Sequence, residues 1–333
     1  MKTFFGTAEG KEIFLYTLEN DRIIMKVSEF GAALVSLIDK ETGTDIAAGF
    51  DSAEAYAADD AYLGMSVGRT ANRIGKGIFE LNGKTYHLPV NNNGNCNHGG
   101  IKGLSYRRYD AEEKESSVTF TCFSPDGEEG YPGNMHVSVT YTLLENGVEI
   151  TAGAKSDQDT LFGYTNHTYF NLDGSDSILD HQLYIPAEEY APLDETGMCL
   201  EQTLKTAGTP FDFTSFHKIG ERIEDDDEQL KLGAGYDHAF VIPGEGMRLM
   251  AQCRGEKLQL TVMSDLPVLQ VYTSNWFSGQ NVKYGKVYHR RAAVALEAAY
   301  RPNAVNYPSV EPKPILKKDE YRECHIRFLI DHI

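Results

Sequence analysis

The chain has 333 residues, of which 41% are hydrophobic and 24% are charged, an ordinary composition for a globular protein. Lysine and arginine total 31 and aspartate and glutamate 49, so the formal net charge is −18. This balance argues against binding to nucleic acid or to an anionic membrane surface. The N-terminus lacks the apolar core of a signal peptide, and no apolar run is long enough to span a bilayer. We therefore expect a cytoplasmic protein.

The cysteines are few and widely spaced. There are five: Cys96, Cys122, Cys199, Cys253 and Cys324. Their number is odd and no CxxC pair occurs, so neither a disulfide framework nor a structural zinc site is expected. We expect reduced thiols and no bound metal.

Alternation of apolar and polar residues with a period of two dominates the chain. It is clearest at residues 23–27, 135–143, 258–262 and 324–330. Because successive side chains of a strand point to opposite faces, these runs predict strands with one buried face.

Turn residues lead to the same interpretation. Asn82-Gly83 stands between IFEL and KTYHL, and Asn146-Gly147 stands between VTYTLLE and VEIT. Asn-Gly supplies the positive φ angles of a tight turn, so each pair predicts a β-hairpin.

Helical patterns are rare and are confined to residues 52–62 and 219–232. Strand and helix patterns do not alternate, which argues against a doubly wound fold or a TIM barrel. No repeat, low-complexity tract or linker interrupts the strand patterns. The sequence therefore predicts an all-β fold, a large antiparallel β-sandwich with few short helices, in a single domain over residues 1–333.

Polar clusters interrupt the apolar stretches, and such residues are rarely buried without a reason. In GRTANRI, Asn72 and Arg73 could donate hydrogen bonds to a neutral polyol, or they could form a solvated surface turn. In NCNHGG, two glycines after His98 would let the backbone approach a ligand, although an incidental loop is equally consistent. Cys96 and His98 alone are weak evidence for a metal. The segment DGEEGYPG indicates only an ordered loop.

Three further polar residues occur within strand-like segments. His167 in TNHTYFNL is either a core residue or a proton donor at a sheet surface. Asp237 in GYDHAF could orient a histidine, bind a sugar hydroxyl or simply begin a strand. Gln270 in LQVYTSN could face a ligand or form a cross-sheet hydrogen bond.

Glu297 is the residue that points most strongly to catalysis. It interrupts the small, apolar strand AAVALEA. A carboxylate buried there is costly unless it is paired or functional, so Glu297 is a candidate general base. The chain has no P-loop, no GxGxxG opening a helix, no GxSxG and no HExxH.

Taken in order, GRTANRIGKGIFELNGKTYHLP, NHGG, DGEEGYPG, TNHTYFNLDG, GYDHAFVI, QVYTSNWF and ALEAAYRPNAVNYP resemble the motif series of the aldose 1-epimerase (galactose mutarotase) family. The matches extend from Gly68 to Pro308. The resemblance implies a galactose mutarotase-like supersandwich with an open, polar sugar cleft. It implies an isomerase that interconverts the α and β anomers of free aldohexoses such as glucose and galactose, without a cofactor.

The resemblance also implies roles for individual residues. His167 corresponds to the general acid and Glu297 to the general base. Arg73 and His98 correspond to residues that bind near the ring oxygen, and Asp237 to the residue that binds sugar hydroxyls. Asn72 and Gln270 correspond to further sugar contacts.

The chemistry needs only proton transfers. One proton leaves the O1 hydroxyl and one reaches the ring oxygen, the ring opens to an aldehyde, and closure on the other carbonyl face inverts the anomer. We expect a carboxylate and a histidinium on opposite sides of the ring to perform both transfers. We expect burial to raise the pKa of Glu297 and the nearby carboxylate to raise that of His167.

The chain departs from the family's motifs in two places. The family often has tryptophan a few residues after HGG, where this chain reads LSYRRYD, with Tyr109 near its end. It often has glutamine two residues after the general base, where this chain has Ala299. Neither change removes a proton-transfer residue, but both bear on sugar preference.

Other functions are compatible with parts of the pattern. A hexose-6-phosphate 1-epimerase would need additional basic residues for the phosphate. A non-catalytic carbohydrate-binding protein would be expected to lack His167 or Glu297. A glycosidase or lyase would need a pair of carboxylates across the bond to be cut. A monosaccharide is the expected partner, bound by a monomer or a homodimer.

Overall fold

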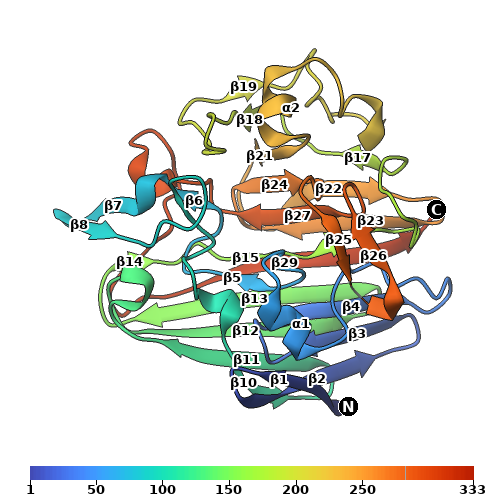
Figure 1. Cartoon of the computed structure of the whole chain (residues 1–333), viewed down its shortest axis with the longest axis horizontal. Helices are drawn as coiled ribbons and strands as arrows, with labels where there is room; N and C mark the ends of the chain where they lie inside the picture. Colours follow the sequence, from blue (N-terminus) through green and yellow to red (C-terminus); the bar gives the residue numbers. More distant parts are fainter. Residues whose placement is uncertain (282) are drawn as a thin grey trace.

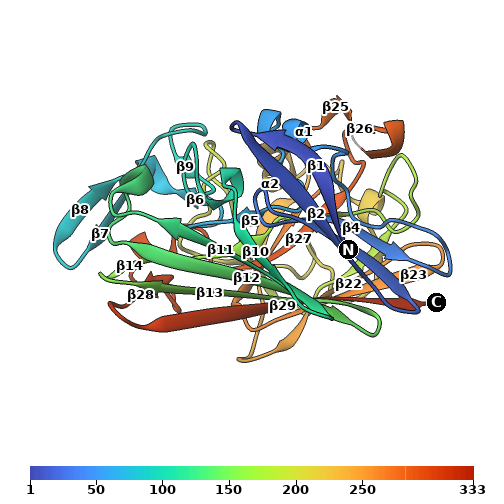
Figure 2. The same ribbon diagram turned by 90° about the horizontal axis from the view of Figure 1, so that it is seen from below.

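The structure is a computed structural model that describes residues 1–281 and 283–333. The described residues form three antiparallel β-sheets, several two-stranded ribbons and two helices of six residues each (Figures 1 and 2). This arrangement confirms the prediction of an all-β fold with few short helices.

The four-stranded sheet contains β1 (Lys2–Ala8), β2 (Lys11–Glu19), β3 (Ile23–Ser28) and β4 (Ala33–Asp39). The nine-stranded sheet contains, in spatial order, β10 (Asp110–Glu113), β11 (Ser117–Ser124), β12 (Met135–Leu144), β13 (Gly147–Ser156), β29 (Tyr321–His332), β23 (Leu258–Ser264), β22 (Arg248–Arg254), β17 (Gln182–Tyr184) and β20 (His217–Lys218). The six-stranded sheet contains β16 (Tyr169–Phe170), β27 (Val294–Ala299), β24 (Val268–Tyr272), β21 (Asp237–Val241), β18 (Glu189–Ala191) and β19 (Leu204–Lys205).

The remaining strands form two-stranded ribbons. They pair β5 (Ser66–Val67) with β15 (Thr165–Asn166), β6 (Arg73–Ile74) with β9 (Cys96–Asn97), β7 (Ile78–Leu81) with β8 (Lys84–His87), β14 (Thr160–Leu161) with β28 (Ile315–Leu316), and β25 (Ser278–Asn281) with β26 (Val287–His289). Short 3₁₀ turns occur at Gly75–Gly77, Leu104–Tyr106, Glu128–Gly130, Ile219–Glu221, Lys283–Gly285 and Ala304–Asn306.

Three of the four alternating runs form β12, β23 and β29 of the nine-stranded sheet, and the run at residues 23–27 forms β3 of the four-stranded sheet; all four bury the predicted face. The register pairs Ile150 with Ile326 and Val148 with Phe328 across β13 and β29. Phe328 then packs edge-on against Phe170, the last residue of β16, with ring centroids 4.9 Å apart. One continuous core therefore joins the nine-stranded sheet to one face of the six-stranded sheet.

The opposite face of the six-stranded sheet is free of this core. In β27, Val294, Leu296 and Ala298 belong to the core, whereas Ala295, Glu297 and Ala299 alternate with them and so lie on the other face. A second core, centred on Ile13, Val35 and Tyr56, packs the four-stranded sheet against the start of this other face.

The two predicted helices are shorter than the sequence pattern indicates. Helix α1 covers Ala53–Ala58, with the hydroxyl of Ser52 accepting from the Ala55 N–H as the N-cap. Helix α2 covers only Glu228–Gly233, and Asp227 caps it. The acidic residues before Asp227 form turns rather than helix, since they are mostly exposed and contribute no buried face to hold a helix in place.

Both predicted hairpins form, but with different turns. Asn82 and Gly83 have φ of 53° and 75° and join β7 to β8, as expected. In the second hairpin Gly147 already pairs with Leu144, so the turn residues are Glu145 and Asn146. A Cβ on Gly147 would lie 2.0 Å from the Phe328 carbonyl oxygen, so this glycine permits close strand packing rather than a turn.

The five cysteines are free, as the sequence predicted. Among the described residues, no helix has the length and apolar character needed to cross a membrane.

Candidate active site

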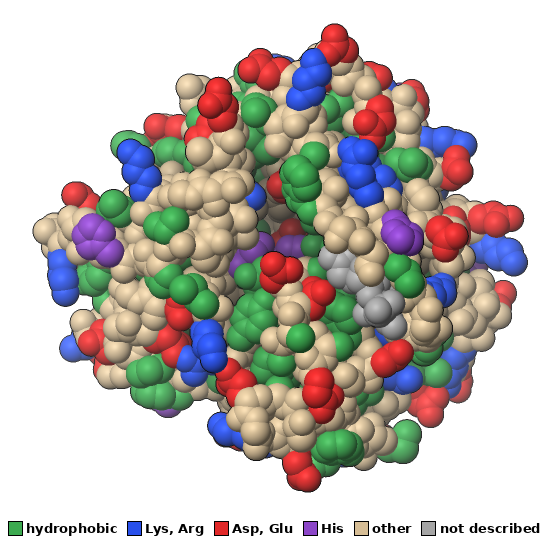
Figure 3. Space-filling model, in the orientation of Figure 1, with side chains coloured by type: hydrophobic (Ala, Val, Ile, Leu, Met, Phe, Trp, Pro, Cys, Tyr) green, Lys and Arg blue, Asp and Glu red, His purple; other side chains and the backbone are tan. Residues whose placement is uncertain are grey.

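A polar cleft of about 490 Å³ opens on the free face of the six-stranded sheet. Its lining includes six of the predicted site residues: Asn72, Arg73, His98, His167, Asp237 and Glu297. In Figure 3 histidine side chains are visible inside a hollow near the middle of the molecular face. Residues far apart in the sequence therefore meet in one place.

The strand register explains how the floor of the cleft is assembled. Gln270 on β24 lies directly opposite Glu297 on β27, and Asp237 on β21 lies opposite Tyr272 on β24. Directly paired residues of an antiparallel sheet share a face. Asp237, Gln270, Tyr272 and Glu297 therefore all project from the face that lines the cleft.

Glu297 lies at the bottom of the cleft, and its two neighbours on the same face are alanines. The residue is only 3% exposed, and Ala295 and Ala299 leave space on both sides of it. Burial raises the pKa of Glu297 well above its ordinary value, and the nearby Asp237 adds to the shift. The result is a strongly basic carboxylate whenever it is ionised.

His167 lies beside Glu297, just after β15. Its backbone N–H donates to the Met65 carbonyl, and its carbonyl accepts from the Gly64 N–H, so both sides of the peptide are fixed. The Nε2 atom is 3.4 Å from Glu297 Oε1, and Nδ1 has no hydrogen-bond partner among the described residues. Burial lowers the pKa of His167 to about 4.

One expectation about this pair needs correction. We expected the nearby carboxylate to raise the pKa of His167, but burial of the ring lowers it instead. The two groups are adjacent, which suits the chemistry because O1 and the ring oxygen are bonded to the same carbon. Their placement on opposite sides of the sugar ring stays a prediction.

His98 and Asn72 hold each other at the wall of the cleft. Both have positive φ, 50° for His98 and 57° for Asn72. The Asn72 N–H donates to His98 Nδ1 at 3.3 Å, and the His98 N–H donates to the Asn72 carbonyl at 3.2 Å. Burial lowers the pKa of His98, and the neighbouring His167 and Arg73 lower it further. The neutral ring accepts at Nδ1, so its proton lies on Nε2, where it can be donated to a ligand.

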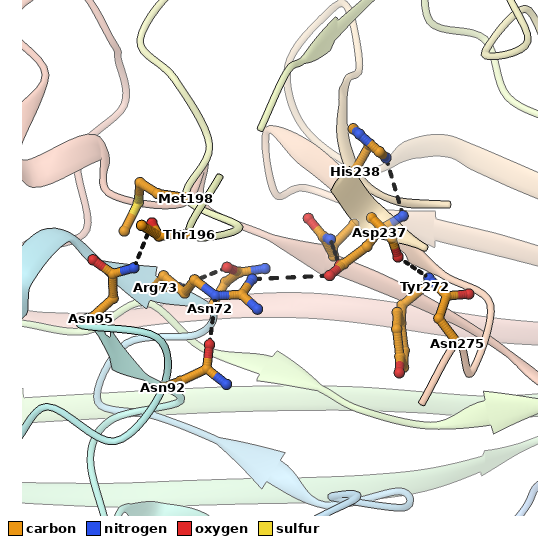
Figure 4. A network of polar contacts seen from close by, with 12 residues as sticks. Asn72, Arg73, Asn92, Asn95, Thr196, Met198, Asp237, His238, Tyr272 and Asn275 are labelled. Carbon is orange, nitrogen blue, oxygen red and sulfur yellow. Dashed lines mark hydrogen bonds and ion pairs between the residues drawn. The ribbon is translucent and has the colours of Figure 1, made fainter. Parts of the chain in front are cut away.

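Arg73 and Asp237 face each other across the cleft (Figure 4). One guanidinium nitrogen of Arg73 lies 4.0 Å from an Asp237 oxygen, and Nε donates to Asn92 Oδ1 at 3.0 Å. Gly197 closes over the same guanidinium, since a Cβ there would lie 3.2 Å from Cζ. Burial raises the pKa of Asp237, although Arg73 and Gln270 oppose the shift.

Gln270 is buried next to the residues that line the cleft. Its Nε2 donates to Asp237 Oδ1 at 2.7 Å, and its Oε1 is buried with no partner among the described residues. It is not part of the cleft lining that the described residues form. The sequence left open a ligand contact or a cross-sheet hydrogen bond, and the structure shows the hydrogen bond.

The segment DGEEGYPG supports the site from outside. Both carboxylate oxygens of Glu129 accept backbone N–H groups, from Ile101 and Lys102, and so hold the loop that follows His98. Arg69, four residues before Arg73, is buried and donates to the backbone of Ser124, Pro125, Pro132 and Gly133. This loop was predicted only to be ordered, and its role is to position the histidine loop.

Sequence reasoning missed several aromatic residues of the cleft. Tyr62, Tyr169, Tyr272 and Trp276 all line it. The Tyr62 ring lies 4.7 Å from the His98 ring and 6.0 Å from the His167 ring, centroid to centroid. Nothing in the sequence separates these tyrosines from the many that fill the cores, because their position depends on strand register and on loop closure.

The geometry can perform a definite kind of chemistry. A buried carboxyl–imidazole pair can transfer protons, and the surrounding amide, guanidinium and imidazole groups can bind hydroxyl groups. The fold and the site together are those of a β-sandwich enzyme that uses acid–base groups on a polar, uncharged ligand.

Comparisons with known proteins agree with this class. The profile of the family described as aldose 1-epimerase matches residues 15–329. The chain is 34% identical over 323 residues to human galactose mutarotase, covering 94% of this chain and 92% of that protein. It is 36% identical over 311 residues to the aldose 1-epimerase of Escherichia coli K12, covering 90% of each.

Solved structures are similar along the whole chain. A galactose 1-epimerase from Lactobacillus acidophilus superimposes with a TM-score of 0.90 at 29% identity, covering 100% of this chain and 98% of that one. A GalM/aldose epimerase homologue from C. elegans gives a TM-score of 0.89 at 29% identity, covering 96% and 99%. The chain belongs to the aldose 1-epimerase family.

Proposed function

We propose that this protein is an aldose 1-epimerase that interconverts the α and β anomers of free aldohexoses such as glucose and galactose. The observation that carries the proposal is the pair of Glu297 and His167, 3.4 Å apart at the bottom of a polar cleft. Membership of the family and the nature of its named relatives support the same activity.

In the proposed reaction Glu297 accepts the proton of the O1 hydroxyl while His167 donates a proton to the ring oxygen. The C1–O5 bond breaks, its electron pair goes to the ring oxygen, and C1–O1 becomes a carbonyl. Rotation about C1–C2 presents the other carbonyl face, and reclosure returns both protons. The pair holds the same number of protons before and after, so no external acid or base is consumed.

The pKa shifts favour these transfers. Ring opening converts a carboxylate and an imidazolium into a carboxylic acid and a neutral imidazole. Burial lowers the pKa of His167 and raises that of Glu297, so it makes the imidazolium a stronger acid and the carboxylate a stronger base. The same shifts disfavour the charged pair, so hydrogen bonds with the bound sugar are needed to stabilise it before ring opening and again on closure.

The other predicted residues bind and orient the sugar in this proposal. Arg73 and the Nε2–H of His98 donate to the ring oxygen region and stabilise charge that develops there. Asp237 accepts from sugar hydroxyls, and Asn72 offers its amide. Gln270 acts by holding Asp237 through the 2.7 Å hydrogen bond.

The charge of the cleft argues for unphosphorylated substrates. Its lining carries the carboxyl groups of Asp60, Glu195, Asp237 and Glu297, and among the described residues its only Lys or Arg is Arg73. Arg73 already contacts Asp237 and Asn92. A phosphate group would meet no free cation there, which disfavours a hexose-6-phosphate 1-epimerase.

Polarimetry tests the proposal. Freshly dissolved α-D-glucose and α-D-galactose should reach anomeric equilibrium faster with the protein than without it, while glucose 6-phosphate should not be accelerated. Glu297→Gln is the matched control, since it retains the shape of the site and removes the base. Sugar binding without any acceleration by the unaltered protein would instead support a carbohydrate-binding protein.

We also propose that residues 1–333 form a single domain.

We further propose that the reaction needs no cofactor. Full activity should persist after treatment with EDTA and dialysis. Activity that vanished on chelation and returned with one divalent ion would contradict this.

A further inference from the structure

Among the described residues, Lys283 is the only lysine that is buried, and it is 3% exposed. It lies in the 3₁₀ turn between β25 and β26, and it does not belong to the cleft lining that these residues form. Its Nζ lies within hydrogen-bonding distance of four oxygens, namely the carbonyls of Val35 at 2.5 Å and Ala47 at 2.7 Å, the Ser36 hydroxyl at 3.1 Å and an Asp45 carboxylate oxygen at 2.7 Å. An ammonium group has three N–H donors, so each donor has an acceptor.

The environment of Lys283 is built to hold this side chain in one place. Burial lowers the pKa of Lys283, and the Asp45 carboxylate opposes that shift. Gly49 leaves room for the stem, since a Cβ there would lie 2.8 Å from the Val35 carbonyl oxygen and 3.4 Å from Lys283 Cε. The Lys283 N–H also donates to the Gly49 carbonyl at 3.2 Å. Withdrawing the cation would leave a buried carboxylate without its charge partner, which is costly.

The hairpin that Lys283 anchors leads directly into the cleft. In Figure 1, β25 and β26 lie beside β4, the strand that contains Val35. Phe277, the residue immediately before β25, lines the cleft and is 6% exposed. Its ring stacks on that of Tyr288 in β26, with centroids 6.2 Å apart, and lies 5.1 Å from the Tyr169 ring. Phe277 is therefore held through the hairpin as well as by its own neighbours.

The acid of the proton-transfer pair is fixed by separate contacts. The His167 N–H donates to the Met65 carbonyl, and this bond involves no residue of the hairpin. The segment that receives Lys283 bonds the chain only after His167, where the Ala48 N–H donates to the Tyr169 carbonyl at 2.8 Å. Loss of the Lys283 anchor should therefore disturb the aromatic side of the cleft more than the proton-transfer groups.

We propose that Lys283 is a positioning residue for the reaction, which fixes the β25–β26 hairpin to residues 35–49 and so holds Phe277 in place against the bound sugar. Lys283 itself does not touch the sugar. This inference rests on the proposed epimerase activity and adds to it a residue outside the cleft. A purely structural anchor would change the free energy of unfolding and leave the kinetics of the folded protein unaltered.

Steady-state kinetics separate the two roles. Lys283→Met retains the length of the stem and removes the cation, so the KM for glucose should rise by about tenfold, the scale of one lost aromatic contact. The kcat should stay within about threefold, because binding is lost equally in the ground and transition states. Lys286→Met is the matched control: Lys286 is exposed, donates to the Gly174 carbonyl at 2.9 Å, and should leave both constants unchanged. An unchanged KM in Lys283→Met, or a loss confined to kcat, would overturn the inference.

Fluorescence reports on the hairpin without reference to turnover. Trp276 precedes Phe277 directly and is the single tryptophan of the chain. Lys283→Met should lower the anisotropy of its emission, because the segment that follows it is no longer anchored, whereas Lys286→Met should not. Anisotropy that stayed the same in Lys283→Met would contradict the anchoring role.

Chemical rescue identifies the oxygen cage as the cause. Lys283→Ala removes three carbons and the nitrogen, which propylammonium can replace; it should restore KM and anisotropy toward those of the unaltered protein. Tetramethylammonium has no N–H donor and should not. Equal effects of the two ions, or no effect of propylammonium, would show that the four oxygens do not hold the hairpin.

A milder variant covers the case in which removal of Lys283 prevents folding. Asp45→Asn keeps Lys283 and removes only the opposite charge, so it should raise KM in the same direction by about threefold with kcat unchanged. An unaltered KM in this variant would overturn the inference. No acceleration of glucose equilibration by the unaltered protein would instead refute the epimerase activity, and the anisotropy would still test the anchor.

Discussion

The floor and the wall of the cleft are built in different ways. The floor residues Asp237, Gln270 and Glu297 project from regular antiparallel strands, where register fixes their spacing. The wall residues Asn72 and His98 stand on loops, with backbone angles that non-glycine residues rarely adopt.

The difference suggests a division of labour. The sheet buries the proton-accepting carboxylate among small side chains, which raises its pKa and gives it one position. The loops present donors whose orientation depends on local hydrogen bonds, such as that from the Asn72 N–H to His98 Nδ1. His167 lies between the two regions, since its backbone is bonded to the 64–65 loop and its ring contacts Glu297.

The largest effect is expected where the two regions meet. Glu297→Gln removes the base and His167→Asn removes the acid, and each should lower kcat by about 10²–10⁴-fold. Sugar affinity should stay within about an order of magnitude, since both variants keep hydrogen-bonding groups of similar shape. Steady-state polarimetry measures both quantities.

The double variant separates concerted action from independent action. Its loss should be smaller than the product of the two single losses, because neither group can complete the reaction alone. Near-normal turnover in Glu297→Gln would refute the proposed mechanism.

The sequence predicts the floor better than the wall. The sequence already marked Glu297 as a carboxylate within the apolar strand AAVALEA, and the structure buries it in β27. The positions of Tyr62 and Trp276 depend on how loops close over the sheet, and no local pattern encodes that. The direction of the His167 pKa shift was also mispredicted, because its degree of burial is a property of the assembled cleft.

The resemblance to the family supplied what local patterns could not. Residue by residue, it singled out Asn72, Arg73 and His98, which the patterns alone left as surface turns or loops. The structure brings these three into the cleft with His167. Gln270, in contrast, is not among the described residues that line the cleft, and it donates to Asp237. Strand pairing alone would have been compatible with a contact to either Asp237 or the ligand.

A smaller loss is expected from the donors of the wall. Arg73→Ala and His98→Ala should each lower kcat/KM by about 10–10³-fold, the scale for one preorganised donor to developing charge. His98→Gln keeps a neutral N–H donor and should recover part of the loss. Unchanged kinetics in either alanine variant would remove that residue from the site.

Tyr62 tests whether the wall needs support from its neighbours. Its ring lies against both His98 and His167, and its own φ is 58°. Tyr62→Ala should free both imidazoles and lower kcat by about 10–10²-fold, because small misplacements of reacting groups are costly. Tyr62→Phe retains the ring contacts and should stay within about threefold of the unaltered protein. Equal losses in the two variants would show that the hydroxyl matters and the ring contacts do not.

The pH dependence should be the smallest of these effects. The active form of the Glu297–His167 pair carries one proton, and this form persists over a wide range of pH. Below the pKa of His167, about 4, the pair takes up a second proton and can no longer accept the O1 proton. Above the raised pKa of Glu297 the pair loses its remaining proton and cannot protonate the ring oxygen. Burial disfavours both of these charged states, so it moves the acidic limb down and the basic limb up. We expect kcat/KM to vary by less than about twofold between the limbs, which belong to the coupled pair rather than to either residue. A narrow optimum with an acidic limb near the ordinary histidine pKa of about 6.5 would show that His167 is solvated during turnover, and that burial of the pair does not tune the reaction.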